Sequence, residues 1–373
     1  MTAFMQEALS LAKKGEFTCA PNPCVGCVIV QNNEIVGRGW HQKTGEAHAE
    51  IHALAQAQEK ARGATCYVTL EPCVHQGRTG PCVTALIQAG IKRVVVATLD
   101  PNPLMAGKGV QALQAAGIAV EVGLLEQEAV QLNQGFFSRM VRKRPFVRAK
   151  IASSLDGRIA MANGESQWIT SMDARQDGHT WRAKSCAILT GRETVKKDNC
   201  RLTARDFHGD FRAPIRMVAD TQLQVSPTAA LFQEPGPVIV ALSEKVSLTQ
   251  QQTWLTSVAN ENVRCLPLPE KNAKIDLHAL LCWLGGQEIN HLLVEAGPTL
   301  TGALLQAGLI DELLIYIAPK FLGEEGIAMV KLPGFRQLSE HIPGTFATID
   351  GIGPDLRVVV KTSDFARFGH DAS

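Results

Sequence analysis

The chain has 373 residues, which is long enough for two domains that each bury a core. Its 45% hydrophobic and 20% charged residues are ordinary for a soluble globular protein, and a formal net charge of +1 with 5% aromatic residues argues against a large nucleic-acid surface. Ten cysteines are few for a disulfide scaffold of this length, and we find no secretory signal and no apolar run of membrane-spanning length. We therefore expect a cytoplasmic protein in a reducing compartment, with neither membrane nor nucleic acid among its partners.

The first third of the chain alternates strand and helix patterns. Residues 5–14 have an amphipathic helix pattern, and the β-rich runs 25–30 and 34–40 flank an Asn-Asn pair that is typical of a hairpin. The elements expected after this hairpin are helices over 46–61, from 82 onward and over 108–117, and strands over 64–70, 92–98 and 119–125. This order implies an α/β domain whose sheet is covered by helices on both faces.

A helix over 126–140 and the basic run 142–145 end this part of the chain. We expect the basic run to be a solvated linker, because four residues are too few for a nucleic-acid surface. The domain boundary is placed near Arg144, which divides the chain into residues 1–144 and residues 145–373.

Four residues of the first domain have the chemistry of a catalytic zinc site. His48 offers an imidazole, Cys73 and Cys82 offer thiolates, and Glu50 offers a carboxylate that need not be a ligand. Three protein ligands leave the fourth position of zinc open for water, whereas a structural zinc usually has a fourth protein ligand. We predict that His48, Cys73 and Cys82 hold Zn²⁺.

We predict that Glu50 is the catalytic proton carrier and that His48 and Glu50 lie where a helix begins. Zinc with an open position lowers the pKa of water from ~15.7 to about 7, which suits hydrolytic removal of an amino group from a heteroaromatic ring. A carboxylate must then move the water proton to a ring nitrogen and to the departing ammonia. Within a helix these two residues would lie about 200° apart, so they can face one metal only where a helix begins.

Other histidines and cysteines in this domain allow different interpretations. His52 could imitate a helical zinc pair with His48, but a core residue or one behind the metal ligands is the simpler interpretation. Cys24 and Cys27 form a C-x-x-C pattern that could be redox-active or metal-binding, although at the start of an apolar strand we expect core residues. His75 and Arg78 lie between the two cysteine ligands, and we expect them to contact substrate, with a solvated loop as the alternative.

The second half of the chain has a different succession of elements. Strands are expected over 146–152, 186–190, 215–219, 238–242, 291–295 and 313–318, and Ser171 is a good N-cap for a helix. Residues 296–302 follow a buried strand and open a helix, so their backbone N–H groups could bind a phosphate. A G-x-G-x-x-G fingerprint is absent, so a Rossmann domain does not follow, and no catalytic acid is evident in this half.

Several motifs together resemble one family. The pattern H-x-E followed by P-C is typical of zinc deaminases, but here the second cysteine comes nine positions after the first instead of three. The chain resembles the bifunctional riboflavin-biosynthesis deaminase/reductase family, which carries this longer loop. The motifs that carry the resemblance are Pro21-Asn22-Pro23, Val25-Gly26-Cys27-Val28, His48-Ala-Glu50, Glu71-Pro72-Cys73-Val-His75-Gln-Gly77-Arg78-Thr79 and Pro81-Cys82. In the second half, Ala-Ser-Ser-Leu-Asp-Gly-Arg, Ser-Gln-Trp-Ile-Thr and Val-Glu-Ala-Gly-Pro-Thr-Leu resemble the reductase domain of the family. A departure is Cys24, where the family often has Asn.

The resemblance implies a cytidine-deaminase-like three-layer α/β/α fold for the first domain and a dihydrofolate-reductase-like α/β fold for the second. It implies that Asn22 and His41 face the substrate ring in the first domain. The residues implied to bind NADPH are Ala152, Trp168, Thr194, Asp198, Thr221, Gly297, Pro298, Thr299, Leu300, Thr301, Gly302 and Ala303. Those implied to bind the substrate of the second domain are Ser166, Arg182, Leu202, Arg205 and Glu295.

Two features of the second domain qualify these assignments. Arg182 and Arg205 suit a sugar phosphate because guanidinium groups bind phosphate bidentately, although each could instead be a solvated surface charge. Asp198-Asn199-Cys200 stands where family members often have Asp-Asp-Pro, which leaves the conformation of this loop open.

We therefore expect a two-step enzyme of riboflavin biosynthesis. The first domain would use Zn²⁺ to deaminate 2,5-diamino-6-ribosylamino-4(3H)-pyrimidinone 5′-phosphate, and the second would use NADPH to reduce the ribosyl group to ribityl. Small pyrimidine ribosyl phosphates are the expected partners, and a homo-oligomer is expected. The alternatives are a nucleic-acid base deaminase with an accessory C-terminal domain, which would show salt-dependent single-strand binding, and a non-enzymatic binding module structured by zinc.

Overall fold

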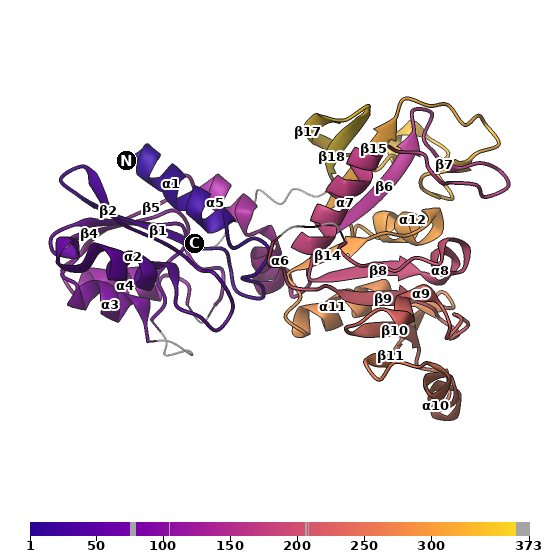
Figure 1. The fold of residues 1–373 in the computed structure, drawn as a ribbon, viewed down its shortest axis with the longest axis horizontal. Helices are drawn as coiled ribbons and strands as arrows, with labels where there is room; N and C mark the ends of the chain where they lie inside the picture. The colour runs from indigo at the N-terminus through magenta and orange to yellow at the C-terminus, as the bar shows by residue number, and fades with distance from the viewer. Residues whose placement is uncertain (75–79, 104, 206, 208, 363–373) are drawn as a thin grey trace. The chain divides into compact units, whose positions relative to one another are not determined.

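The computed structural model describes residues 1–74, 80–103, 105–205, 207 and 209–362, and these fall into two compact units. The first unit contains residues 1–143, and the second begins at Arg144. Each unit has its own main sheet (Figure 1). Among the described residues, no helix is long and apolar enough to cross a membrane.

The sheet of the first unit has the strand order β2-β1-β3-β4-β5. β1 pairs antiparallel with β2 and β3, whereas β3, β4 and β5 run parallel. Asn32 and Asn33 both have positive φ and form the hairpin turn between β1 and β2, as the Asn-Asn pair predicts. The strands are β1 (Gly26–Gln31), β2 (Glu34–Trp40), β3 (Thr65–Val68), β4 (Arg93–Val96) and β5 (Ala119–Val122).

Helices cover both faces of this sheet. α1 and α5 lie on one face, and α2, α3 and α4 lie on the other (Figure 1). Along β1, Cys27 and Ile29 belong to the apolar cluster under α2, α3 and α4, while Val28 and Val30 belong to the one under α1 and α5. The expected α/β/α layering is therefore confirmed. The helices are α1 (Thr2–Lys13), α2 (Ala49–Ala57), α3 (Cys82–Gln88), α4 (Lys108–Ala115), α5 (Glu126–Leu132) and α6 (Gln134–Arg142).

Two glycines of β2 determine where α2 lies. A Cβ at Gly39 would be 2.1 Å from the carbonyl oxygen of Ala49, and a Cβ at Gly37 would be 2.2 Å from that of Ala53. Because no side chain fits at these distances, only glycine lets the backbone of α2 lie directly on β2. The first turn of α2 is thereby placed beside the end of β2.

The main sheet of the second unit has the order β11-β10-β9-β8-β14-β6-β15-β18-β17. The strands from β11 to β15 in this order run parallel, and β18 and β17 add an antiparallel edge. The carboxyl ends of the parallel strands share one edge, which is where ligands bind in open α/β sheets. The strands are β6 (Phe146–Ser154), β8 (Ala187–Gly191), β9 (Ile215–Ala219), β10 (Val238–Ser243), β11 (Val263–Leu268), β14 (His291–Val294), β15 (Glu312–Ala318), β17 (Thr345–Ile352) and β18 (Asp355–Lys361).

The helices of the second unit connect these strands. Ser171 caps the first of them, since its side chain accepts a hydrogen bond from the backbone N–H of Ala174, as its sequence position predicts. The helices are α7 (Met172–Lys184), α8 (Arg192–Asp198), α9 (Ala230–Gln233), α10 (Leu248–Ser257), α11 (Leu277–Gly286) and α12 (Pro298–Gln306). Two short ladders pair β12 (Glu270–Lys271) with β13 (Lys274–Ile275) and β7 (Arg158–Ala160) with β16 (Ile327–Ala328).

The single helix expected over 126–140 is wrong, because the chain forms α5 and α6 with a break at Asn133. The side chain of Asn133 accepts a hydrogen bond from the N–H of Cys24 at 2.7 Å and donates one to its carbonyl oxygen at 2.9 Å. A contact with a loop 109 positions earlier therefore accompanies the break, and no local pattern signals it. The helix expected from 46 begins instead at Ala49.

Candidate active sites

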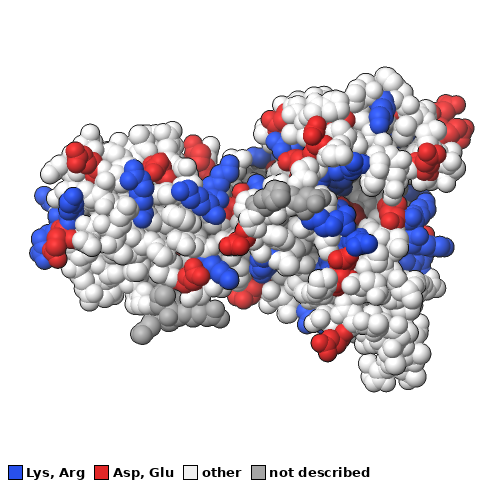
Figure 2. Space-filling model, viewed as in Figure 1, with Lys and Arg blue, Asp and Glu red and all other residues white. Residues whose placement is uncertain are grey.

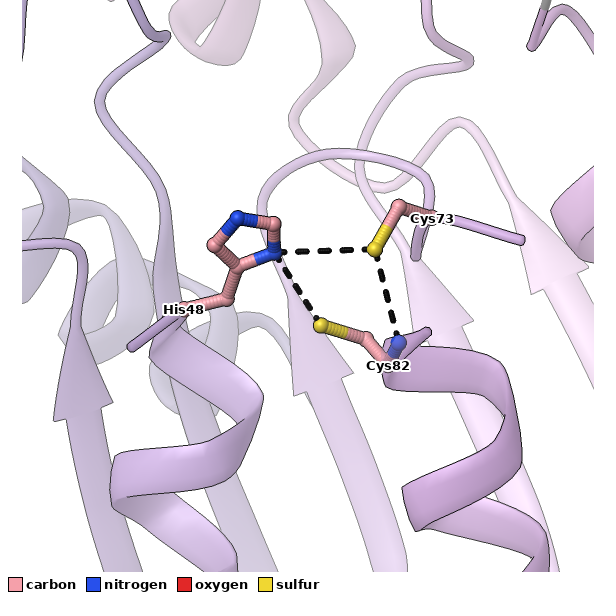
Figure 3. Close-up of side chains that lie close together, drawn as sticks. All are labelled: His48, Cys73 and Cys82. Carbon is pink, nitrogen blue, oxygen red and sulfur yellow. Dashed lines mark hydrogen bonds between the residues drawn. The ribbon is translucent and has the colours of Figure 1, made fainter. Parts of the chain in front are cut away.

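Three side chains of the first unit converge on one point. Nδ1 of His48 lies 3.2 Å from Sγ of Cys82 and 3.5 Å from Sγ of Cys73. All three potential ligand atoms lie within 4.8 Å of one another, and no other such group of three occurs in the part of the chain that the structure describes. Figure 3 shows the ring nitrogen and the two sulfurs pointing toward one another.

Two helix starts bring these side chains together. His48 is the N-cap of α2, and Glu50 lies in the first turn of the same helix. Cys82 is the first residue of α3, and its backbone N–H donates to Sγ of Cys73 at 3.4 Å. Both helix N-termini therefore meet at the site, where their dipoles favour thiolate and carboxylate groups.

This donor set fits zinc. In a tetrahedral zinc site the ligand atoms, about 2.0 to 2.3 Å from the metal, lie roughly 3.5 Å from each other, which is close to both nitrogen–sulfur distances here. Without a cation the two thiols compete for one negative charge. Hydrogen bonding to Cys82 lowers the pKa of Cys73 to about 4, and the same bond raises the pKa of Cys82. A divalent cation removes this conflict because it stabilises both thiolates.

Glu50 is the carboxyl group beside these ligands. Its side chain is buried, with 3% exposure, and shares a hydrogen bond with the Cys82 thiol. Burial, reinforced by the charge of Cys73, raises the pKa of Glu50 to about 7. A carboxyl group in this environment can both accept and release a proton near neutral pH.

Asn22 and His41 extend the cluster beyond the metal ligands. Nδ2 of Asn22 lies 3.0 Å from Nε2 of His41, and Nδ1 of His41 lies 3.2 Å from the carbonyl oxygen of Ala47. The His41 ring stands edge-on to the His48 ring with centroids 5.5 Å apart. Burial lowers the pKa of His41, which favours the neutral ring. The chain thus places His41 beside the candidate ligand His48 and Asn22 beside His41; His75 and Arg78 lie outside the described residues.

The other histidine and cysteine candidates lie apart from the ligand group. His52 lies within α2 and is not one of the three converging side chains. Cys27 is buried with its sulfur 3.4 Å from that of Cys66, and Cys24 is buried with its sulfur 3.0 Å from that of Cys19. Both positions agree with the interpretation of this C-x-x-C pattern as core residues.

Glu71 has a role that its sequence position alone does not indicate. Its buried carboxylate accepts hydrogen bonds at 2.7 to 3.1 Å from four backbone N–H groups between residues 100 and 110. A Cβ at Gly109 in that segment would lie 2.2 Å from the carbonyl oxygen of Pro72. The segment therefore packs against Glu71 and Pro72, and it anchors the chain directly before the candidate ligand Cys73. The available signal was an acidic residue directly before Pro72-Cys73 at the end of an apolar strand.

In the second unit, the candidate cofactor residues gather at the carboxyl ends of the parallel strands. Ala152 lies near the end of β6, Thr194 and Asp198 lie on α8 after β8, and Thr221 follows β9. The backbone N–H of Gly297, the N-cap of α12, donates to Oγ1 of Thr194 at 3.0 Å. This bond joins two of the candidate segments at the same edge of the sheet.

The first turns of α12 contain the remaining candidates from Pro298 to Ala303, and they face in different directions. Thr301 is buried, and its hydroxyl donates to the carbonyl oxygen of Ala296. A Cβ at Gly302 would lie 2.0 Å from the carbonyl oxygen of Lys331, so this glycine permits close packing. Trp168, in contrast, is 63% exposed, with the Arg175 guanidinium 4.2 Å from its ring centroid.

Among the candidate substrate residues, Arg182 and Glu295 form a bidentate ion pair. Nε and Nη2 of Arg182 donate to the two carboxylate oxygens at 2.5 and 2.7 Å, and Nη1 donates to the carbonyl oxygen of Thr203 at 3.1 Å. Burial alone would raise the pKa of Glu295, but the charge and hydrogen bonds of Arg182 outweigh it and hold this pKa at about 2. Arg205 is exposed, whereas Leu202 is buried and Ser166 is half-buried.

Lys150 is a candidate that the sequence does not indicate. It lies on β6 beside Tyr316, with its ammonium nitrogen 5.7 Å from the centroid of that ring. Burial lowers the pKa of Lys150, and the charge of Glu295 opposes this shift. One feature of the sequence could have marked Lys150 as functional: it is a lysine in the middle of a buried parallel strand, and such strands usually consist of apolar residues.

Comparisons with known proteins decide the family. The family described as "Cytidine and deoxycytidylate deaminase zinc-binding region" matches residues 1–98, and the family "RibD C-terminal domain" matches residues 145–357. The "Riboflavin biosynthesis protein RibD" of Escherichia coli (strain K12) is 50% identical over 364 residues, which cover 95% of this chain and 97% of that protein. The chain belongs to the RibD family.

Solved RibD structures share the fold of the whole chain. RibD of Acinetobacter baumannii, form 1, has a TM-score of 0.88 at 43% identity, covering 97% of this chain and 98% of that one. The Thermotoga maritima protein named diaminohydroxyphosphoribosylaminopyrimidine deaminase/5-amino-6-(5-phosphoribosylamino)uracil reductase has a TM-score of 0.84 at 33% identity, with coverage of 97% and 98%. These likenesses confirm the expected cytidine-deaminase-like and dihydrofolate-reductase-like folds.

This RibD-family chain is a bifunctional enzyme of riboflavin biosynthesis, with a zinc-dependent deaminase domain and an NADPH-dependent reductase domain that act on small molecules. This family assignment therefore replaces the two alternatives, a nucleic-acid base deaminase and a zinc-structured binding module. Figure 2 shows both basic and acidic side chains on the face that it draws.

Proposed function

We propose that the first unit deaminates 2,5-diamino-6-ribosylamino-4(3H)-pyrimidinone 5′-phosphate and that the second unit reduces the ribosyl group of the product to ribityl. The observation that carries the proposal is the convergence of His48, Cys73 and Cys82 beside the buried Glu50. The name of the similar Thermotoga maritima protein contains both activities. We take residues 1–144 and 145–373 as the two catalytic domains.

In the deamination, Glu50 moves the protons. His48, Cys73 and Cys82 would hold zinc, which would supply Lewis-acid activation of the attacking water. Glu50 takes a proton from this water and delivers it to the ring nitrogen, and it then carries the proton of the added hydroxyl to the departing amino group, which leaves as ammonia. The ring carbon exchanges its C–N bond for a C–O bond. Asn22 and His41, which contact each other at 3.0 Å, hold the pyrimidine, and His75 and Arg78 complete its contacts.

In the reduction, the chain positions the sugar and supplies a proton. The candidate residues of β6, α8 and α12 would bind NADPH, which would supply the hydride for C1′ of the ribosyl group. The C1′–O4′ bond breaks, and O4′ takes a proton. Lys150 is our candidate donor, because burial lowers its pKa and it lies within the field of Glu295. The ion pair of Arg182 with Glu295 orients the sugar, which leaves the exposed Arg205 for the phosphate.

We also propose that the chain forms a homo-oligomer in the cytoplasm. β17 is the outermost strand of the second sheet and exposes Phe346 at 69% and Ile349 at 58%. An apolar edge strand can pair with the same strand of a second copy about a twofold axis. The thiolate ligands favour a reducing compartment. Sedimentation analysis should show a dimer or larger species, and a monomer at micromolar concentration would contradict this part of the proposal.

Two assays test the proposed reactions separately. The zinc-loaded chain is mixed with the diaminopyrimidine substrate without NADPH, and ammonia release is expected. It is then given the deaminated intermediate with NADPH, and loss of NADPH absorbance is expected. A zinc-loaded chain that releases no ammonia contradicts the first reaction, and NADPH that stays reduced contradicts the second.

A further inference from the structure

Two thiols face each other under the loop that carries Asn22. Sγ of Cys19 lies 3.0 Å from Sγ of Cys24. The two side chains are 2% and 8% exposed and pack with Ala12 and Leu132 in a small apolar cluster, separate from the two clusters that flank the sheet. Neither belongs to the metal-ligand group, so the deaminase mechanism does not use them.

Hydrogen bonds anchor both ends of this loop. The N–H of Cys19 donates to the carbonyl oxygen of Gly15 at 2.9 Å, and the Thr44 hydroxyl donates to the carbonyl oxygen of Cys19 at 2.7 Å. The side chain of Asn133 binds both the N–H and the carbonyl oxygen of Cys24. The two sulfurs are therefore held opposite each other.

We propose that Cys19 and Cys24 are a site of reversible oxidation, and that a disulfide between them lowers deaminase activity without affecting the reductase. The effect on activity depends on the proposed role of Asn22 in the deaminase site, whereas the formation of the disulfide does not. Where disulfides form in reducing compartments, they are usually transient and redox-sensing.

The oxidant is a peroxide. It converts one thiol to a sulfenic acid and releases one water; the second thiol then attacks that sulfur, the S–S bond forms, and a second water leaves. The two thiols together lose two electrons and two protons, and a thiol reductant reverses the change. The loop residues Pro21, Asn22 and Pro23 are only half-buried, so local opening of this short segment admits a small oxidant.

The bond would displace Asn22. A disulfide is about 2.05 Å long, so the sulfurs must approach by about 1 Å. Pro21 and Pro23 restrict φ on both sides of Asn22, so the loop absorbs little of this shift. The 3.0 Å contact between Asn22 and His41 must then change next to the His48 ring. Since a misplacement of about 1 Å can slow a reaction about 100-fold, we expect ammonia release to fall at least about tenfold.

The test compares the full-length, zinc-loaded wild type with Cys24→Ser after the same hydrogen peroxide treatment. Peptide mass spectrometry should find a Cys19–Cys24 link in the wild type only. Ammonia release by the wild type should fall at least about tenfold and return with dithiothreitol, while NADPH oxidation stays unchanged. Cys24→Ser should keep both activities. Cys24→Ala serves as a second variant, because it places no hydroxyl group in the apolar cluster.

Three results would overturn the proposal. The first is the absence of a Cys19–Cys24 link in the treated wild type, and the second is a link with unchanged ammonia release. The third is a loss of ammonia release in treated Cys24→Ser and Cys24→Ala that equals the loss in the treated wild type. The last result would assign the loss to oxidation of the zinc-ligand thiols. If the reduced wild type releases no ammonia at all, the proposed deaminase function fails, and the mapped link still decides whether the disulfide forms.

Discussion

The deaminase and reductase sites of this chain are assembled in different ways. The three candidate zinc ligands lie within 34 positions of one another, and their atoms converge. The reductase candidates extend from Lys150 to Ala303 and come from several strands and helices along one edge of the sheet. The first site carries its chemistry in a few side chains, whereas in the second the cofactor supplies the hydride and the protein supplies position and charge. Single substitutions should therefore abolish the deaminase activity but only reduce the reductase activity, by amounts that differ from residue to residue.

The largest expected effect is at Glu50. Glu50→Gln should lower ammonia release about 1,000-fold, because the amide cannot carry the proton, while zinc content and NADPH oxidation with the deaminated intermediate stay unchanged. The exposed Glu46, four positions earlier, is the matched control as Glu46→Gln. Normal deamination by Glu50→Gln would remove the proton-carrier role.

Lys150 tests whether the second site has a proton donor of its own. Lys150→Met should lower the kcat of NADPH oxidation about 100-fold, with NADP⁺ affinity and ammonia release unchanged, because only the donated proton is lost. NADP⁺ affinity is measured by fluorescence titration, and the exposed Lys274→Met is the control. A parallel loss of affinity and rate would instead give Lys150 a structural role.

Gly39 tests how far the deaminase site depends on the backbone beneath it. Gly39→Ala should destabilise the first unit by about 1 to 3 kcal/mol and reduce bound zinc, since its Cβ would collide with Ala49 and push α2 outward. Thermal unfolding and zinc content are the readouts. Gly178→Ala, where a Cβ meets nothing within 4 Å, is the control. Unchanged melting and zinc content would show that α2 needs no such contact.

The smallest expected effect is at Arg205. Arg205→Ala should raise the reductase KM for the sugar phosphate about tenfold and leave kcat nearly unchanged, because it removes a contact made equally in the ground and transition states. The nearby Arg201, which pairs with Glu234 at 2.7 Å, is the matched control as Arg201→Ala. An unchanged KM for Arg205→Ala would exclude it from the phosphate site.

The three side chains that the sequence predicts as metal ligands converge in the structure, and the pattern that marks them is local. His48 and Glu50 are two positions apart at a helix start, and two cysteines after prolines complete the set. The hairpin at Asn32-Asn33 and the cap at Ser171 are equally local, and both are confirmed.

What the sequence does not predict depends on distant contacts. The anchoring of residues 100–110 by Glu71, the helix break at Asn133 and the field of Glu295 at Lys150 each join segments about 30 or more positions apart. The pairing of Arg182 with Glu295 spans 113 positions, so the sequence shows two charges but not that each neutralises the other. The edge strands β17 and β18 were likewise not expected, because β17 is almost wholly exposed and has no buried alternation.

The most direct test of the account is the zinc content of the purified chain together with X-ray absorption at the zinc edge. We expect one zinc per chain, bound by one imidazole nitrogen and two sulfurs, with the remaining position held by a light atom that does not come from the protein. A chain without stoichiometric zinc, or a spectrum lacking either the nitrogen or the sulfur ligands, would contradict the assignment of His48, Cys73 and Cys82.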